Sequence, residues 1–160
     1  MKNSFCKVKK QLSKRDIDEL NQQIESQFGR ASFFGKKDNV MLIEKNSVKL
    51  IVKDQPLFFY VNDLLVPTLK FLLTDNFLKK VTVDMGAVKF VANGADVMRP
   101  GITMFDEGIR KNECVVVVDE THNKPLAVAQ ALFSAEEMRE KDSGKVLKTV
   151  HFVGDKIWLI

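Results

Sequence analysis

The chain has 160 residues, of which 45% are hydrophobic and 29% are charged, a composition typical of a folded globular protein. No apolar run approaches the roughly 20 residues that span a bilayer, and no apolar core follows the charged N-terminus as in a signal peptide. We therefore expect a cytoplasmic protein that does not enter membranes. The formal net charge is +4, and residues 1–80 hold 15 Lys and Arg against 9 Asp and Glu, whereas residues 81–160 hold 10 against 12. A basic half is typical of a protein with a polyanionic partner, although an excess of this size also serves solubility alone.

The first half predicts strands mixed with two helices. Residues 4–10 favour an edge strand with lysines toward solvent. The spacing of Ile17, Leu20, Ile24 and Phe28 predicts an amphipathic helix over 14–28, which begins at a capping box at Ser13 and ends at Gly29. Three strands are expected next, followed by a helix in which Pro67 occupies the first turn. These strands are residues 40–44, 47–52 and 57–61, and the helix ends near 75–76.

The second half predicts short strands with a few short helices, the pattern of a small barrel or sandwich. Residues 114–119 are almost wholly apolar, so we expect them in a closed core. Gly94 is expected to end a short helix, and Gly154-Asp155 to form a hairpin turn. The expected elements are strands near 81–83, 96–99, 114–119, 125–133, 148–153 and 156–160, and helices over 85–93 and after Ser134. The fold class is therefore α+β, with a mixed α/β domain over 1–78 and a small, mostly-β domain over 79–160.

Residue patterns that carry catalysis or bind metals are missing from this sequence. It contains no G-x-S-x-G, H-E-x-x-H, Walker A or G-x-G-x-x-G motif. Cys6 and Cys114 are far apart and are expected to be reduced thiols. His122 falls in a predicted turn and is expected to be exposed. His151 falls in a strand and is expected to be structural or on the surface, with stacking on RNA as the alternative. No catalytic residue, metal or cofactor is expected.

One segment carries a long and specific resemblance. Residues 83–102 read V-D-M-G-A-V-K-F-V-A-N-G-A-D-V-M-R-P-G-I. This segment resembles the start of a PUA domain, which is named after pseudouridine synthase and archaeosine transglycosylase. Upstream, residues 57–59, 66–70 and 72–73 resemble the domain that precedes PUA in the malignant T-cell-amplified sequence proteins and in the N-terminal part of ligatin. The short chain is similar to an archaeal member, and the resemblance implies a PUA-type pseudo-barrel over 79–160.

The resemblance implies an RNA-contacting groove in the helix–loop–strand region of this motif. A positive φ costs little conformational free energy at Gly94, and the small Ala95 lets another backbone approach closely. The two residues are therefore expected to form a notch. Lys89 and Arg99 are candidates for phosphate contacts, although relatives often carry an uncharged residue at the position of Arg99. Base edges would meet Gly94, Ala95 and Asp96, and Asn93 and Gly101 are further RNA-binding candidates. The alternative is that residues 94–101 only build the turn.

A second candidate surface is basic and lies near the N-terminus. It comprises Lys7, Lys9, Lys10, Lys14 and Arg15, together with Lys36 and Lys37. Its alternative is a solvated strand and loop. The resemblance implies a non-catalytic, translation-associated protein that binds tRNA near its acceptor end, or rRNA, and docks on the small ribosomal subunit or a density-regulated-protein-like partner. Three alternatives stay open: an accessory of RNA modification, a protein–protein adaptor with a PUA fold, and an enzyme.

Overall fold

The computed structural model describes the backbone from Cys6 to Ile160 and the side chains from Lys9 onward. The chain divides between Pro67 and Thr68 into two compact units. Helix α2 (Leu69–Thr74) packs on strand β10 (Pro125–Ala131) and so belongs to the second unit. The domain boundary at 78/79 stays a prediction. Among the helices of the described chain, none is both long and apolar enough to cross a membrane.

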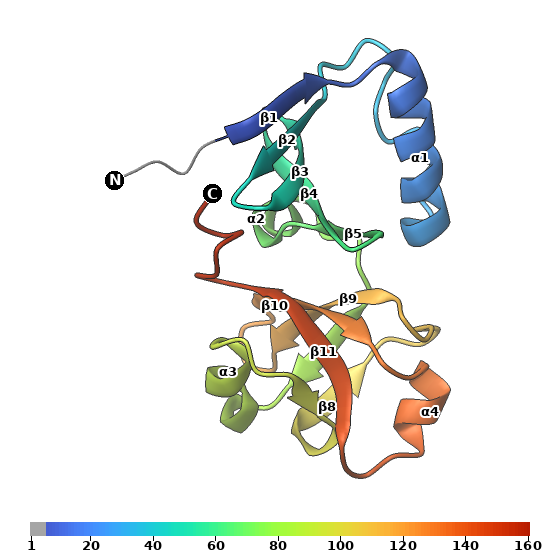
Figure 1. The fold of residues 1–160 in the computed structure, drawn as a ribbon. Coiled ribbons are helices and arrows are strands. Elements are labelled where there is room, and N and C mark those ends of the chain that lie inside the picture. Colours follow the sequence, from blue (N-terminus) through green and yellow to red (C-terminus); the bar gives the residue numbers. More distant parts are fainter. Residues whose placement is uncertain (1–5) are drawn as a thin grey trace. The chain divides into compact units, whose positions relative to one another are not determined.

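The first unit is a five-stranded sheet with one helix on its face (Figure 1). Each strand pairs antiparallel with the next one in the sequence, and the predicted N-terminal strand is at one edge. Helix α1 (Lys14–Phe28) begins at the capping box of Ser13 and Asp16 and ends at Gly29, whose φ is 71°. The strands are β1 (Cys6–Gln11), β2 (Met41–Lys45), β3 (Val48–Lys53), β4 (Gln55–Val61) and β5 (Leu64–Pro67).

An aromatic cluster and two hydrogen bonds of a glutamine side chain hold α1 on this sheet. The side chain of Phe58 is fully buried, and its ring centroid lies 6.0 Å from that of Phe28 and 5.4 Å from that of Phe33. The Gln27 side chain donates to the carbonyl of Leu65 at 3.0 Å and accepts from its backbone N–H at 3.2 Å. This pair of bonds fixes the C-terminal half of α1 against β5.

The second unit is a six-stranded sheet that curls on itself. Its strand order is β7-β11-β10-β9-β6-β8, and the two edge strands are joined by the three residues of the 3₁₀ turn η1. Three residues span at most about 11 Å, so both edges must lie close together and the sheet forms a nearly closed pseudo-barrel. Its elements besides α2 and β10 are β6 (Lys80–Val83), α3 (Met85–Val91), β7 (Val97–Met98), η1 (Arg99–Gly101), β8 (Ile102–Phe105), β9 (Cys114–Asp119), α4 (Ala135–Arg139) and β11 (Lys145–Phe152).

The core of this unit lies inside the curled sheet. All six residues of β9 are buried, as the apolar run predicts, and β6 pairs with β9 in parallel. Fully buried alanines on β10 share this core with larger side chains, such as Met138 on α4. The predicted α+β class is confirmed, with a mixed first unit and a mostly-β second unit.

One prediction at a sheet edge is wrong, and the edge strands β5 and β8 have no counterpart among the predicted elements. Pro67 does not open a helix: it ends β5 and pairs with Phe58, and Thr68 caps α2 by accepting from the N–H of Phe71 at 3.2 Å. β5 is an edge strand, where a residue without an N–H is tolerated. The sequence also gave no expectation of β8, the other edge strand of the second sheet.

The predicted C-terminal hairpin is wrong as well. Residues 156–160 form turns instead of a strand. Asp155 accepts from the N–H of Phe152 and of Trp158, both at 2.9 Å, and the N–H of Leu159 donates to the Asp155 carbonyl. Side-chain bonds of this kind offer the backbone an alternative to a strand ladder.

Candidate nucleic-acid interface

The motif over 83–102 folds as helix α3, a tight loop and strand β7. Asp84 begins the helix by accepting from the N–H of Ala87 at 2.9 Å. At the other end, the N–H of Gly94 donates to Val91 and the N–H of Ala95 donates to Phe90, at 2.9 and 3.0 Å. This is the Schellman pattern, which needs a left-handed residue at Gly94, and its φ is 91°. The expected role of Gly94 in ending the helix region is confirmed.

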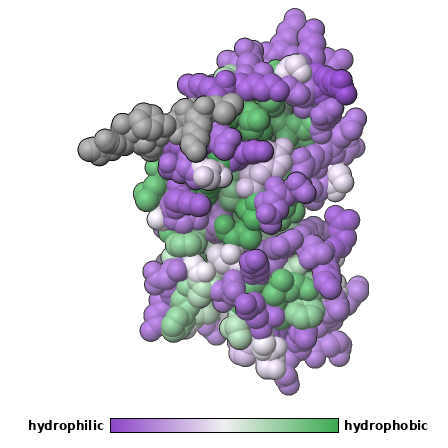
Figure 2. Space-filling model, in the orientation of Figure 1, coloured by the Kyte–Doolittle hydropathy of each residue, from purple (hydrophilic) through white to green (hydrophobic). Residues whose placement is uncertain are grey.

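A hollow of about 570 Å³ lies between α3 and the segment that follows it, and we call it the α3 groove. Its lining is mainly apolar, and two lining side chains, Phe90 and Met98, are 59% and 50% exposed. Close packing shapes one wall, because a Cβ at Gly101 would lie 3.0 Å from the Cβ of Ala87. Figure 2 shows pale green, hydrophobic residues among purple ones over α3 at the lower left, and a second hydrophobic area farther to the right on the same unit. Large apolar side chains that stay exposed around a hollow are typical of a binding site.

A polar network fixes the rim of the groove to β11. Asp96 accepts from the N–H of Thr149 at 2.9 Å and forms an ion pair with Lys145 at 3.0 Å, while the Thr149 hydroxyl donates to the Ala95 carbonyl. Burial opposes ionisation of Asp96, but these hydrogen bonds and the charges of Lys145 and Lys148 hold its pKa below the ordinary value. Lys148 is exposed and forms no ion pair within the described part of the chain. The rim is therefore rigid and carries cationic side chains.

The structure brings some of the predicted RNA contacts together. Ala95, Asp96 and Gly101 line the α3 groove, and Gly94 supports the loop from behind. Lys89 is exposed on α3, with its ammonium 5.3 Å from the centroid of the Phe90 ring. The exposed Asn93 side chain donates to the carbonyl of Lys89 at 2.8 Å. These positions stay predictions as RNA contacts.

Arg99 lies apart from these residues. Its Nε donates to the carbonyl of Met138 at 2.7 Å, and its guanidinium lies 5.5 Å from the ring centroid of Phe105. It is not among the residues that line the α3 groove. The arginine therefore ties η1 to the end of α4.

Sequence reasoning gave no role to four residues of this site. Both Phe90 and Met98 stand in the motif, in which Met98 is expected to build the turn and Phe90 has no predicted function. Lys145 reaches the rim through the pairing of β11 with β7, in which it faces Met98, and the charge of Lys148 on the same strand acts on Asp96. Phe90 is the one aromatic residue of the motif, and this is the signal that the sequence carries for it. The place of the two lysines at the rim depends on long-range strand pairing, so the local sequence does not indicate it.

The predicted N-terminal basic surface is partly neutralised. Lys10 forms an ion pair with Asp16 at 3.6 Å, and Arg15 forms one with Glu19 at 3.4 Å. Lys9 and Lys14 are exposed, as are the loop residues Lys36 and Lys37. The side chain of Lys7 lies outside the described residues, as does that of Cys6.

The histidines and Cys114 have structural surroundings. His151 is 1% exposed, so stacking on RNA is excluded; its Nε2 accepts from the N–H of Leu69 at 3.0 Å, and its Nδ1 lies 2.8 Å from Asp155 Oδ2. Burial lowers the pKa of His151, although Asp155 opposes the shift. His122 is exposed, as predicted. Burial raises the pKa of the Cys114 thiol to about 12. The described residues contain no cluster of three or more His, Cys, Asp or Glu that could hold a metal.

Comparison with known proteins gives consistent matches over both units. Residues 79–153 match the family model of the PUA domain, and residues 9–75 match a domain of unknown function, DUF1947. An uncharacterized protein from Methanocaldococcus jannaschii is 44% identical, over 92% of this chain and 93% of that protein. Translation machinery-associated protein 20 from Saccharomyces cerevisiae is 33% identical, over 77% and 73%. A crystal structure of a hypothetical protein from the archaeon Pyrococcus horikoshii has a TM-score of 0.82 at 39% identity, covering 95% of this chain and 98% of that one.

Proposed function

This chain belongs to the PUA-domain family of translation machinery-associated protein 20 and the malignant T-cell-amplified sequence proteins, a family with an RNA-binding, translation-related role, and we propose that it is a non-catalytic tRNA-binding factor. In this proposal, the α3 groove holds unpaired nucleotides of a structured RNA, above all the single-stranded acceptor end of tRNA. The observation that carries the proposal is the groove itself, an apolar hollow with an exposed aromatic ring and a cationic rim.

The chemistry of the groove suits an unstacked base. Sequence-specific recognition of RNA uses single-stranded ends and loops, whose bases stack on aromatic side chains. The Phe90 ring is exposed beside the groove, and one such stacking contact contributes about 1–3 kcal/mol. Met98, also exposed, offers an adaptable apolar surface on the other side. A base that leaves water for this hollow therefore gains apolar contact on both sides.

Phosphates would be held at the rim. Lys89 on α3 and Lys148 on β11 are exposed cations on the two elements that border the loop 94–96. Each phosphate that a lysine neutralises releases counterions, so binding falls with added salt. The paired Lys145 contributes less, because Asp96 already neutralises it at 3.0 Å.

The first unit is proposed to dock on the small ribosomal subunit or on a density-regulated-protein-like partner. What supports this is its exposed, unpaired Lys9, Lys14, Lys36 and Lys37, because within the described side chains these have no ion pair. Lys10 and Arg15 contribute less because Asp16 and Glu19 neutralise them.

The test is a fluorescence titration with tRNA, intact or without its single-stranded 3′ end, at two salt concentrations. Wild type is compared with Phe90→Ala and Lys148→Glu. The matched controls are Met104→Ala and Lys124→Glu, which change an exposed apolar residue and an exposed lysine outside the groove. We expect the groove variants to weaken binding of intact tRNA at least fivefold and the controls to change it less than twofold.

Three results would contradict the proposal. If the affinity is the same for tRNA with and without its 3′ end but falls strongly with added salt, the protein binds phosphates without recognising the acceptor end. Equal losses for the groove variants and their controls place the RNA elsewhere. Failure to bind tRNA at low salt favours a protein–protein adaptor.

A further inference from the structure

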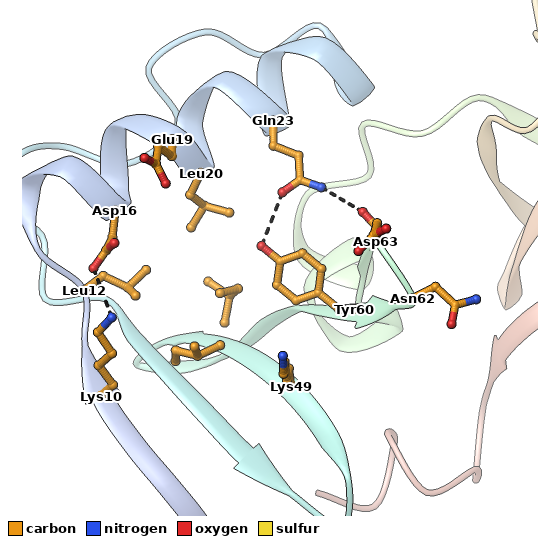
Figure 3. A pocket seen from close by; sticks show the side chains of 12 residues that line it. Lys10, Leu12, Asp16, Glu19, Leu20, Gln23, Lys49, Tyr60, Asn62 and Asp63 are labelled. Carbon is orange, nitrogen blue, oxygen red and sulfur yellow. Dashed lines mark hydrogen bonds and ion pairs between the residues drawn. The ribbon is translucent and has the colours of Figure 1, made fainter.

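The first unit contains a second hollow, of about 370 Å³, between the N-terminal half of α1 and the sheet (Figure 3). We call it the α1 pocket. Its floor is apolar and formed by side chains from the loop before α1, from α1 itself, and from strands β2 and β3. These are Leu12, Leu20, Leu42 and Ile51. The ring of Tyr60 on β4 stands beside them, with its hydroxyl directed toward α1. A hollow of this volume is in the range of small-molecule sites, roughly 300–1,000 Å³.

The polar wall of the α1 pocket is fixed in place. The Tyr60 hydroxyl donates to Oε1 of Gln23 at 3.3 Å. The Gln23 amide in turn donates to the Asp63 carbonyl at 3.1 Å and to Oε1 of Gln27 at 3.0 Å. Gln27 is held by both polar groups of Leu65. A ligand would therefore meet a wall that is already ordered, which lowers the entropy lost on binding.

Charges around the pocket nearly cancel. Three of the lining charges are already paired: Lys10 and Asp16 with each other, and Glu19 with Arg15. Three exposed rim side chains form no hydrogen bond or ion pair within the part of the chain whose side chains are described: Lys49, Asn62 and Asp63. The free rim thus offers one cation, one amide and one carboxylate. It has donors and acceptors without a net charge.

This combination selects one class of ligand. An isolated phosphate is disfavoured, because it would meet a single free ammonium among carboxylates. A lysine or arginine side chain is disfavoured, because it would meet the like charge of Lys49. A flat, neutral heterocycle places its faces on the apolar floor and its edge donors and acceptors against the rim. We propose that the α1 pocket binds a nucleobase of an unpaired nucleotide. This site lies within the first unit and does not depend on the α3 groove.

The single tyrosine of the chain supplies a direct probe. Full-length protein labelled with 3-fluorotyrosine gives one ¹⁹F resonance, from Tyr60 in the pocket. AMP, GMP, CMP and UMP are titrated separately, with ribose 5-phosphate as the probe without a base and N-acetylarginine amide as the cationic probe. We expect a saturable shift with at least one nucleotide, and none with ribose 5-phosphate or the arginine derivative.

Neighbouring residues of one strand provide the variant and its control. Leu42 lines the pocket, and Ile43 next to it does not; successive side chains of a strand point to opposite faces. Both are half-buried, so both accept a larger side chain at similar cost. Leu42→Phe narrows the pocket and should weaken nucleotide binding at least tenfold, whereas Ile43→Phe should change it less than twofold. Thermal unfolding checks that both variants fold.

Four outcomes overturn the assignment. They are a missing shift with every nucleotide, an equal shift with ribose 5-phosphate, a shift with the arginine derivative alone, and unchanged binding in a folded Leu42→Phe variant. Failure of the tRNA proposal is distinguishable, because Phe90→Ala and Lys148→Glu should leave the Tyr60 shift unaltered.

Discussion

Replacing Gly94 by alanine tests how the motif builds the α3 groove. Gly94 has a φ of 91°, and a Cβ built on it would lie 2.6 Å from Cε1 and 2.9 Å from Cζ of Phe152. Gly144 has a φ of 88° with no heavy atom within 4 Å of its Cβ position. The two glycines thus share a left-handed backbone and differ in the space around it. Gly144→Ala is the matched control.

The expected magnitudes follow from these two facts. A left-handed backbone costs a residue with a Cβ about 1–2 kcal/mol, and both variants bear this cost. Only Gly94→Ala must also displace a half-buried aromatic ring, and overpacking of this kind costs about 1–3 kcal/mol. Gly94→Ala should therefore lower the free energy of unfolding by about 2–5 kcal/mol and Gly144→Ala by about 1–2.

Urea unfolding of the two variants and of wild type measures the difference. Phe152→Leu, which removes the ring atoms nearest to Gly94, serves as the second arm of a double-mutant cycle. We expect it to reduce the cost of Gly94→Ala by about 1–3 kcal/mol, because the two sites are in contact. Equal costs for Gly94→Ala and Gly144→Ala, or an additive double mutant, would refute the packing argument.

Three further predictions concern other sites. Burial lowers the pKa of His151 below 6.5, so below about pH 6.5 the unfolded chain binds more protons than the folded chain. The free energy of unfolding should therefore decrease as the pH is lowered, by at most about 1.4 kcal/mol per pH unit. Thermal unfolding between pH 5 and 8 should show this slope in wild type and in His122→Gln, and a flatter profile in His151→Gln. The Cys114 thiol, with a pKa near 12, should resist iodoacetamide at pH 8 in a Cys6→Ser background until urea unfolds the chain; complete labelling of native protein would contradict this. Ser13→Ala removes the capping box of α1 and should cost about 1 kcal/mol in urea unfolding, whereas the exposed Ser26→Ala on the same helix should stay within about 0.5 kcal/mol.

Elements with strong local patterns could be predicted from the sequence. Helix α1 has both a capping box and apolar residues at helical spacing, and its observed bounds equal the predicted ones. Strand β9 has five apolar residues followed by Asp119, and all six are buried. In both cases burial and backbone preference favour the same structure, so local sequence is sufficient.

The missed elements depend on partners far away in the sequence. β8 is stabilised by pairing with β6 on one side only, and its four residues have a mixed burial pattern. Pro67 fits the first turn of a helix and the end of an edge strand equally well, and the pairing with Phe58 decides between them. At the C-terminus, the Asp155 side chain binds two backbone N–H groups and turns the chain away from a strand.

Arg99 shows why the same limit applies to the candidate site. Its neighbours in the motif fix its backbone, but the direction of its side chain depends on the carbonyl of Met138 and the ring of Phe105. The Nε bond of 2.7 Å runs to the end of α4, where a cation is also favoured by the helix dipole. Phosphate binding by Arg99 would have to replace these contacts. The side chain of Lys148 forms no hydrogen bond or ion pair within the described residues, so its ammonium can bind phosphate without breaking such a contact, although its charge also acts on Asp96. Of the two cations that the motif supplies, the scaffold holds Arg99 and Lys89 stays exposed, whereas Lys148 comes from a strand about 50 residues after Arg99.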